Sequence, residues 1–222
     1  MIIIVDYGMG NLRSVAKALE HLGAQVRVTD DPAQVAGAKK LVLPGVGAFD
    51  AAMEELKTRR LIEPLSTAIR GGVPYLGICL GLQLLFEDSE EGHCQGLGIL
   101  RGRVRRFPDD AKLKIPHMGW NQVTRSQKAP PTGLADPPRS VAEEGRRQNG
   151  CPLLKEIPEG GFFYFVHSYY ADPADRSLVA LEADYGVPFA AMVWRGNIYA
   201  TQFHPEKSQA LGLKFLQNFI EQ

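Results

Sequence analysis

The stretch Val73-Pro74-Tyr75-Leu76-Gly77-Ile78-Cys79-Leu80-Gly81-Leu82-Gln83-Leu84-Leu85-Phe86 decides the fold of this 222-residue chain. Residues 73–78 are typical of a buried strand, and residues 80–86 have the apolar spacing of a helix, with almost no loop between them. Glycines two residues on either side of Cys79 allow the strand and the helix to approach each other closely. The segment therefore predicts a sharp strand-to-helix turn with Cys79 at its apex.

Short apolar runs alternate with helical patterns on the N-terminal side of this segment. Asn11 can cap the first helix, and Gly23 can end it. We expect strands over 1–5, 25–28 and 41–43, and helices over 12–22, 49–57 and 61–70. This alternation predicts βαβ units in a parallel sheet.

The second half of the chain is rich in strand patterns separated by turn residues, which indicates antiparallel pairing. We expect strands over 99–107, 162–166, 178–183, 189–194 and 197–201. An apolar stripe over 209–220 predicts a C-terminal helix that packs on the sheet. The pattern as a whole predicts a three-layer, doubly wound α/β fold with a mostly parallel central sheet and a smaller antiparallel part.

One segment, 125–150, differs in composition from the rest of the chain. It holds four Pro and three Gly, and its aliphatic residues larger than Ala are only Leu134 and Val141. Such a segment buries too little apolar surface to offset the cost of ordering it. We therefore predict a single domain over 1–222 that contains a flexible insertion over 125–150.

Charge and cysteine content exclude several classes of protein. With 25 basic and 25 acidic residues, the chain lacks the charge of a general nucleic-acid or anionic-membrane binder. The apolar start, Met1–Val5, is far shorter than the ~20 residues of a membrane span and lacks the basic start of a signal peptide. Three cysteines without a Cys-x-x-Cys pair argue against disulfides and against a metal site. We expect a cytoplasmic protein.

Cys79 is a candidate nucleophile. A thiol at a helix N-terminus feels the positive end of the helix dipole, which lowers its pKa and favours the thiolate. A structural cysteine packed between two glycines explains the segment Gly77–Gly81 equally well, so this segment alone does not decide between the two.

The tripeptide His204-Pro205-Glu206 supplies the base that such a nucleophile needs. Residues two apart on an extended segment point to the same side, so the Glu206 carboxylate can orient the His204 imidazole. The alternative is a surface loop with incidental polar residues. A zinc deaminase site fits less well, because its downstream Pro-Cys-x-x-Cys is absent.

A third feature is Pro44-Gly45-Val46-Gly47, directly after an expected buried strand. Acyl chemistry at Cys79 creates an oxyanion, and main-chain N–H groups of a neighbouring strand-end loop and of the residue after the nucleophile commonly stabilise it. Val46, Gly47 and Leu80 are the candidates, although Pro-Gly alone indicates no more than a turn. All of these loops leave the carboxyl ends of strands, where open α/β sheets bind their ligands.

The remaining histidines and the first glycine-rich loop indicate less. His21 and His93 are expected to face solvent, whereas His117 and His167 have apolar or aromatic neighbours typical of a core. The loop Gly8-Met9-Gly10 lacks the third glycine of a dinucleotide-binding fingerprint, so no such cofactor is expected.

Taken together, these motifs resemble the class I (triad) glutamine amidotransferases. Within them, the chain resembles the glutamine amidotransferase subunits of imidazole glycerol phosphate synthase, an enzyme of histidine biosynthesis. The resemblance covers nearly the whole chain and rests on Asp6–Asn11, Pro44–Phe49, Gly77–Phe86, His117–Asn121, Phe163–Tyr170 and Ala200–Ser208.

The resemblance implies a glutaminase without a cofactor. Cys79 would attack the side-chain carboxamide of L-glutamine, His204 would transfer the protons, and Glu206 would orient His204. The positions that match the glutamine pocket of the family are Gly47, Gln83, Glu91, Ser168 and Tyr169. Glu91 would face the α-ammonium group of the substrate.

The resemblance also implies a heterodimer with a (β/α)₈-barrel cyclase subunit. Ammonia would pass into that subunit, which converts a phosphoribulosyl-formimino-carboxamide nucleotide to imidazole glycerol phosphate and aminoimidazole carboxamide ribotide. Asn121, Gln122, Tyr164 and Lys207 match positions at or near this interface. The segment 125–150 is longer than the family pattern, and every catalytic motif lies outside it.

Three other functions fit parts of the sequence. A glutaminase of pyridoxal phosphate synthesis would share the Cys79 turn, but Met118–Asn121 and Pro44–Phe49 argue against it. A catalytically silent protein of the same fold would not need Cys79, His204 and Glu206 together. A stand-alone cysteine peptidase fits least well. Ammonia release from glutamine distinguishes these alternatives.

Overall fold

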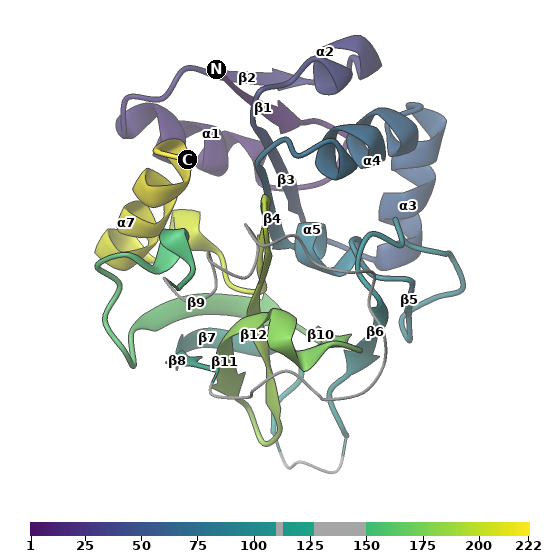
Figure 1. The fold of residues 1–222 in the computed structure, drawn as a ribbon. Coiled ribbons are helices and arrows are strands. Elements are labelled where there is room, and N and C mark those ends of the chain that lie inside the picture. Colours follow the sequence, from purple (N-terminus) through teal and green to yellow (C-terminus); the bar gives the residue numbers. More distant parts are fainter. Residues whose placement is uncertain (110–112, 127–149) are drawn as a thin grey trace.

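The fold is built on an eight-stranded sheet with the strand order β2-β1-β3-β4-β13-β12-β11-β8. The computed structural model describes residues 1–109, 113–126 and 150–222 (Figure 1). Strands β2, β1, β3, β4 and β13 are parallel, and β12, β11 and β8 continue the sheet antiparallel. The strands of this sheet are β1 (Ile2–Val5), β2 (Val26–Thr29), β3 (Leu41–Gly45), β4 (Tyr75–Cys79), β8 (Thr124–Arg125), β11 (Val179–Asp184), β12 (Pro188–Arg195) and β13 (Ile198–Thr201).

Helices cover both faces of the parallel strands. The helices are α1 (Leu12–His21), α2 (Pro32–Ala36), α3 (Phe49–Thr58), α4 (Ile62–Arg70), α5 (Leu80–Gln83) and α7 (Gln209–Ile220). In Figure 1, α1 and α7 lie on one side of the sheet, and α3, α4 and α5 lie on the other.

Strand β1 shows why both faces are covered, since all of its side chains are buried. Ile2 and Ile4 belong to the core on the α1 and α7 side, whereas Ile3 and Val5 belong to the core on the α3 and α4 side. The expected three-layer, doubly wound fold is therefore confirmed.

The antiparallel part consists of the last three strands of the large sheet and of two small sheets. One small sheet has the order β10-β6-β5, and the other pairs β7 with β9. Their strands are β5 (Asp88–Ser89), β6 (Gly102–Arg106), β7 (His117–Gln122), β9 (Phe162–His167) and β10 (Tyr169–Pro173). These strands gather below the helical layers in Figure 1.

The expected helix over 80–86 is wrong in its length, because α5 ends at Gln83. The N–H groups of Leu85 and Phe86 donate to the carbonyl groups three residues back, those of Leu82 and Gln83, at 3.2 and 3.1 Å, so the i→i−4 pattern of an α-helix is not continued. Helix α2 and strands β5, β8 and β10 were not expected from the sequence. All four are five residues or shorter, and this length does not establish a periodicity.

The predicted insertion lies mostly outside the described residues, which omit 127–149. Its first residue, Arg125, belongs to β8 and pairs with Leu181 of β11, so the sheet extends into the segment by one residue. Among the described residues, no helix has both the length and the apolar character that crossing a membrane requires.

Candidate active site

Cys79 lies at the turn where β4 ends and α5 begins, as the sequence predicts. Its backbone has φ +55° and ψ −105°, a strained conformation for a residue with a side chain. The flanking glycines make the turn possible. A Cβ atom on Gly81 would collide with the carbonyl oxygen of Leu43, and one on Gly77 would lie 2.5 Å from the carbonyl oxygen of Gly81. The turn therefore requires glycine at both positions.

His204 and Glu206 form a buried pair next to Cys79. His204 follows β13, and Glu206 lies in the short 3₁₀ helix η3 (Pro205–Lys207). Nδ1 of His204 lies 2.9 Å from Oε1 of Glu206, and the two side chains are 2% and 1% exposed. Nε2 of His204 makes no hydrogen bond to the described residues. This nitrogen can therefore exchange a proton with a group other than Glu206.

The electrostatics of His204 favour its charged form. Burial alone would lower the pKa of His204, but the neighbouring Cys79 side chain and the hydrogen-bonded Glu206 carboxylate together raise it above its ordinary value. A histidine held in this way stabilises a thiolate–imidazolium pair.

A cavity of about 380 Å³ opens beside the sulfur of Cys79. The residues predicted to bind glutamine and those predicted to stabilise the oxyanion all line it. The lining is made by Val46, Gly47, Cys79, Leu80, Gln83, Glu91, Pro116, Val166, His167, Ser168 and Tyr169. Pro116, Val166 and His167 were not predicted, although each lies within or next to a recognised motif. His204 and Glu206 are not among the residues that line this cavity.

The loop that bears Glu91 is fastened to the start of α3. Oε2 of Glu91 accepts a hydrogen bond of 2.8 Å from the N–H of Phe49. The carboxylate of Asp50 accepts hydrogen bonds from the N–H groups of His93 and Cys94, and these bonds hold the pKa of Asp50 below its ordinary value. Asp50 was not predicted from the sequence, because its partners lie more than forty positions away.

The loop after β3 places Val46 and Gly47 at the cavity. Gly47 has φ +104°, a conformation that favours glycine, and the side chain of Val46 is 41% exposed. Val46, Gly47 and Leu80 thus lie together in the wall of the cavity beside Cys79.

Strands β7 and β9 form a ribbon whose outer face is apolar and exposed. Met118, Trp120 and Phe162 on this face are 62%, 46% and 52% exposed. The same ribbon contacts the catalytic candidates, because the N–H of His204 donates to the carbonyl of Tyr164 at 2.9 Å. A protein bound to the outer face of this ribbon would therefore be separated from His204 only by strand β9.

The four predicted interface residues differ in orientation. Lys207 places its ammonium group 5.7 Å from the centre of the Tyr164 ring, and Gln122 is exposed. Asn121 instead donates from its side chain to the carbonyl of Asp184 at 2.8 Å and lies 3.3 Å from Nε2 of His117. The side chain of Asn121 thus faces inward, toward the buried histidines.

His117 and His167 are core residues, as the sequence predicts. They are 3% and 6% exposed, and Nδ1 of His117 lies 2.9 Å from Nε2 of His167. Burial lowers the pKa of His117 to about 4 and the pKa of His167 to about 3. His21 and His93 are exposed, also as predicted.

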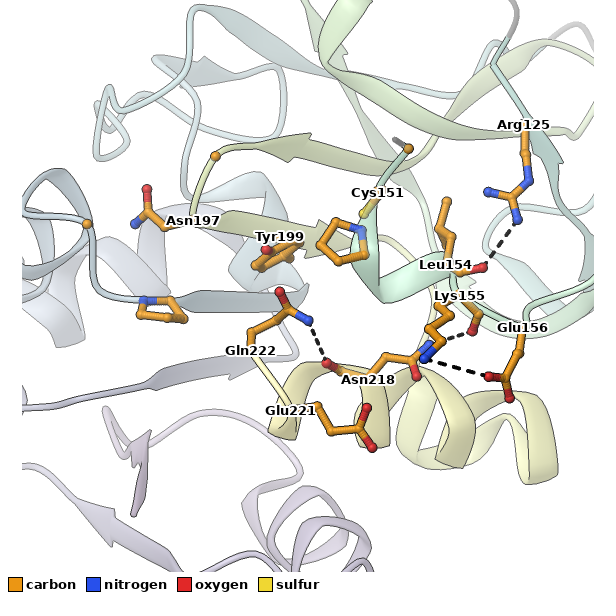
Figure 2. A pocket seen from close by; sticks show the side chains of 15 residues that line it. Arg125, Cys151, Leu154, Lys155, Glu156, Asn197, Tyr199, Asn218, Glu221 and Gln222 are labelled. Atoms are coloured by element: carbon orange, nitrogen blue, oxygen red, sulfur yellow. Dashed lines mark hydrogen bonds and ion pairs between the residues drawn. The ribbon is translucent and has the colours of Figure 1, made fainter. Parts of the chain in front are cut away.

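A second, larger cavity of about 1010 Å³ lies between α7 and the residues around Cys151 (Figure 2). Polar groups there bond to one another, as when the Asn218 amide donates to the carbonyl of Lys155 at 2.7 Å. Burial raises the pKa of the Cys151 thiol to about 12, so this thiol stays protonated near neutral pH. No group of His, Cys, Asp or Glu side chains among the described residues is arranged to hold a metal ion.

Comparisons with known proteins show the family of this chain. The family model "Glutamine amidotransferase class-I" matches residues 3–222. The protein named imidazole glycerol phosphate synthase subunit HisH from Syntrophotalea carbinolica is 52% identical over 99% of this chain and 98% of its own length. The protein of the same name from Aromatoleum aromaticum is 50% identical over 99% of this chain and 97% of its own length.

Solved structures show the same fold at lower identity. A glutamine amidotransferase structure covers 100% of both chains with a TM-score of 0.68 and 16% identity. The structure of PurLQS from Thermotoga maritima covers 99% of this chain and 97% of the matched chain, with a TM-score of 0.67 and 19% identity. The family model and the full-length relatives establish that this chain belongs to the class-I glutamine amidotransferases.

Proposed function

We propose that this protein is the glutamine-hydrolysing subunit of an imidazole glycerol phosphate synthase. The principal observation is that Cys79 lies on a strained turn, at a cavity and beside the buried His204–Glu206 pair. Relatives about half identical over their full length bear the name of that subunit, which supports the same assignment here.

The reaction proceeds through a thioester at Cys79. His204 takes the thiol proton, and the sulfur attacks the carboxamide carbon of glutamine. The tetrahedral intermediate collapses when His204 returns that proton to the leaving nitrogen, which departs as ammonia. His204 then deprotonates a water molecule that attacks the thioester and releases glutamate and the thiol. Glu206 keeps Nε2 of His204 directed at the reacting atoms throughout.

The cavity wall provides the remaining contacts. N–H groups of Val46, Gly47 and Leu80 stabilise the negative oxygen of the tetrahedral intermediates. Glu91, whose carboxylate is fixed by the N–H of Phe49, pairs with the α-ammonium group of glutamine. Gly47, Gln83, Ser168 and Tyr169 enclose the rest of the amino acid.

We further propose that the partner is a (β/α)₈-barrel cyclase and that the pair functions in the cytoplasm. The exposed apolar face of β7 and β9, with Gln122, Tyr164 and Lys207 beside it, is the surface that suits a protein partner. Ammonia then passes from Cys79 to the cyclase, which uses it to form imidazole glycerol phosphate.

The decisive experiment measures imidazole glycerol phosphate formation by this protein mixed with the cyclase and its nucleotide. We expect glutamine to support synthesis with the unaltered protein. The Cys79→Ala variant should bind the cyclase but lose glutamine-dependent synthesis, while added ammonium salt still supports the reaction. Glutamine hydrolysis that survives Cys79→Ala would overturn the mechanism. Hydrolysis without any transfer of ammonia to the cyclase would point to a different synthase partner.

A further inference from the structure

A buried amide side chain, that of Gln202, contacts the sulfur of Cys79. Gln202 is fully buried, and its Nε2 lies 3.6 Å from Sγ of Cys79, within range of a hydrogen bond to sulfur. Its Oε1 accepts a hydrogen bond of 3.1 Å from Nε2 of Gln83. Gln202 precedes His204 by two residues, the spacing that places side chains on one side of an extended segment.

The direction of these hydrogen bonds follows from one main-chain carbonyl. Nε2 of Gln83 lies 2.9 Å from the carbonyl oxygen of Tyr169, which can only accept. The amide nitrogen of Gln83 must therefore face Tyr169, and its second hydrogen must go to an oxygen. That oxygen is Oε1 of Gln202. Gln202 consequently presents its N–H, rather than its oxygen, to the sulfur.

The same carbonyl also accepts a hydrogen bond from a buried histidine, His167. Nδ1 of His167 lies 2.8 Å from the oxygen of Tyr169 and must donate to it, so Nε2 of His167 is an acceptor. It accepts from Nδ1 of His117, and Nε2 of His117 in turn accepts from the Asn121 amide at 3.3 Å. Every member has one consistent role when both histidines are neutral, and their lowered pKa values agree with that state.

We infer that Gln202 stabilises the Cys79 thiolate by donating a hydrogen bond to the sulfur, and that Gln83 and His167 fix its donor orientation through the carbonyl of Tyr169. This inference rests on the proposed role of Cys79 as the nucleophile. The sulfur has a second partner, the main-chain carbonyl of Val166 at 3.9 Å. This carbonyl can only accept a hydrogen bond and therefore favours the protonated thiol. The amide of Gln202 opposes that preference, while Gln83 and His167 act as positioning residues.

The test is the pH dependence of Cys79 alkylation in the full chain. Iodoacetamide reacts with the thiolate, and mass spectrometry assigns the modified cysteine. Gln202→Met keeps the length of the side chain and removes its N–H donor. We expect the alkylation rate of Cys79 at pH 7 to fall about tenfold and its pH profile to move upward, since a hydrogen bond to a charged group has about this effect. Cys94, which is partly exposed, should react unchanged in the same sample.

Asn218→Leu is the matched control. Asn218 is also a buried amide, 2% exposed, but it bonds to the carbonyl groups of Leu153 and Lys155. Its loss should lower the melting temperature without moving the alkylation profile of Cys79. If Gln202→Met does not fold, Gln202→Asn, which withdraws the donor by one methylene group, is measured in the same way.

An unchanged Cys79 profile in the folded Gln202 variant would overturn the inference, even if the variant were less stable. Alkylation requires neither glutamine nor a partner, so this outcome is separate from a failure of the proposed function. In the complex with the cyclase, the expected companion result is a lower kcat for glutamine with a nearly unchanged KM.

Discussion

The carboxylate of Glu91 caps α3 from a distant loop by accepting a 2.8 Å hydrogen bond from the N–H of Phe49. Ala48, at the N-cap position of this helix, has no side chain that can do so. Because Glu91 also lines the cavity at Cys79, one carboxylate serves both the helix and the proposed ammonium site. Its charge and its hydrogen bond can therefore be separated by mutation.

Glu91→Gln removes the charge and keeps an oxygen for Phe49. We expect the KM for glutamine to rise at least about tenfold, because the ammonium group loses a charged partner, while kcat changes little. The free energy of unfolding should change by less than about 1 kcal/mol, since the cap is retained. Steady-state kinetics and urea unfolding check this expectation. An unchanged KM would remove Glu91 from the proposed binding site.

Asp50 controls the same loop without touching the cavity. Asp50→Ala removes the acceptors for the N–H groups of His93 and Cys94, so the loop bearing Glu91 keeps only its Phe49 bond to the start of α3 among the bonds described above. We expect the KM for glutamine to rise by roughly threefold to tenfold, from the loss of about 1 kcal/mol of positioning. Glu54→Ala, at an exposed acidic residue one turn further along α3, is the control and should leave the KM unchanged. Equal effects of both variants would indicate a general charge effect instead.

The strained backbone at Cys79 predicts an unusual order of stabilities. At φ +55°, any side chain costs about 1–3 kcal/mol that glycine avoids. We therefore expect C79G to be at least as stable as C79A, although both are inactive. The same change from alanine to glycine at Ala200, which is also buried and lies in the neighbouring strand β13, should cost about 1 kcal/mol. Thermal unfolding of the three variants decides the point. If C79G were less stable than C79A by as much as A200G is less stable than the unaltered protein, the turn would not be strained.

The sequence predicts those features of the fold and of the site whose interacting residues lie close together in the chain. Local spacing was sufficient for β4, for the turn at Cys79 and for α7, because their signals lie within a dozen residues. It failed for the length of α5, since the N–H groups of Leu85 and Phe86 bond to carbonyl groups three residues back, and apolar spacing does not show this departure from the α-helix.

Within the site, recognisable motifs identified Cys79, His204, Glu91 and the loop at Gly47. Gln202 was missed because its two partners, Cys79 and Gln83, lie more than 115 positions away in the chain. The pairing of His117 with His167 depends on the register of β7 against β9, which no local pattern specifies.

That pairing makes the stability of the protein depend on pH. In the unfolded chain both histidines bind a proton near pH 6.5, whereas burial lowers the folded pKa of His117 to about 4 and that of His167 to about 3. Between these values the unfolded state binds more protons, so the free energy of unfolding falls as the pH decreases from about 6.5. Each histidine contributes a slope approaching about 1.4 kcal/mol per pH unit. Urea unfolding between pH 7 and pH 5 measures this slope.

His117→Gln should roughly halve the slope, because one of the two buried groups is then unable to titrate. His21→Gln, at an exposed histidine in the last turn of α1, should leave it unchanged. The window ends at pH 5 because carboxylates begin to titrate below it. If the His117→Gln variant kept the full slope, another group would be responsible for the pH dependence. The neutral state of His117 and His167, which sets the direction of the hydrogen bonds from Asn121 to Tyr169, would then lose its support.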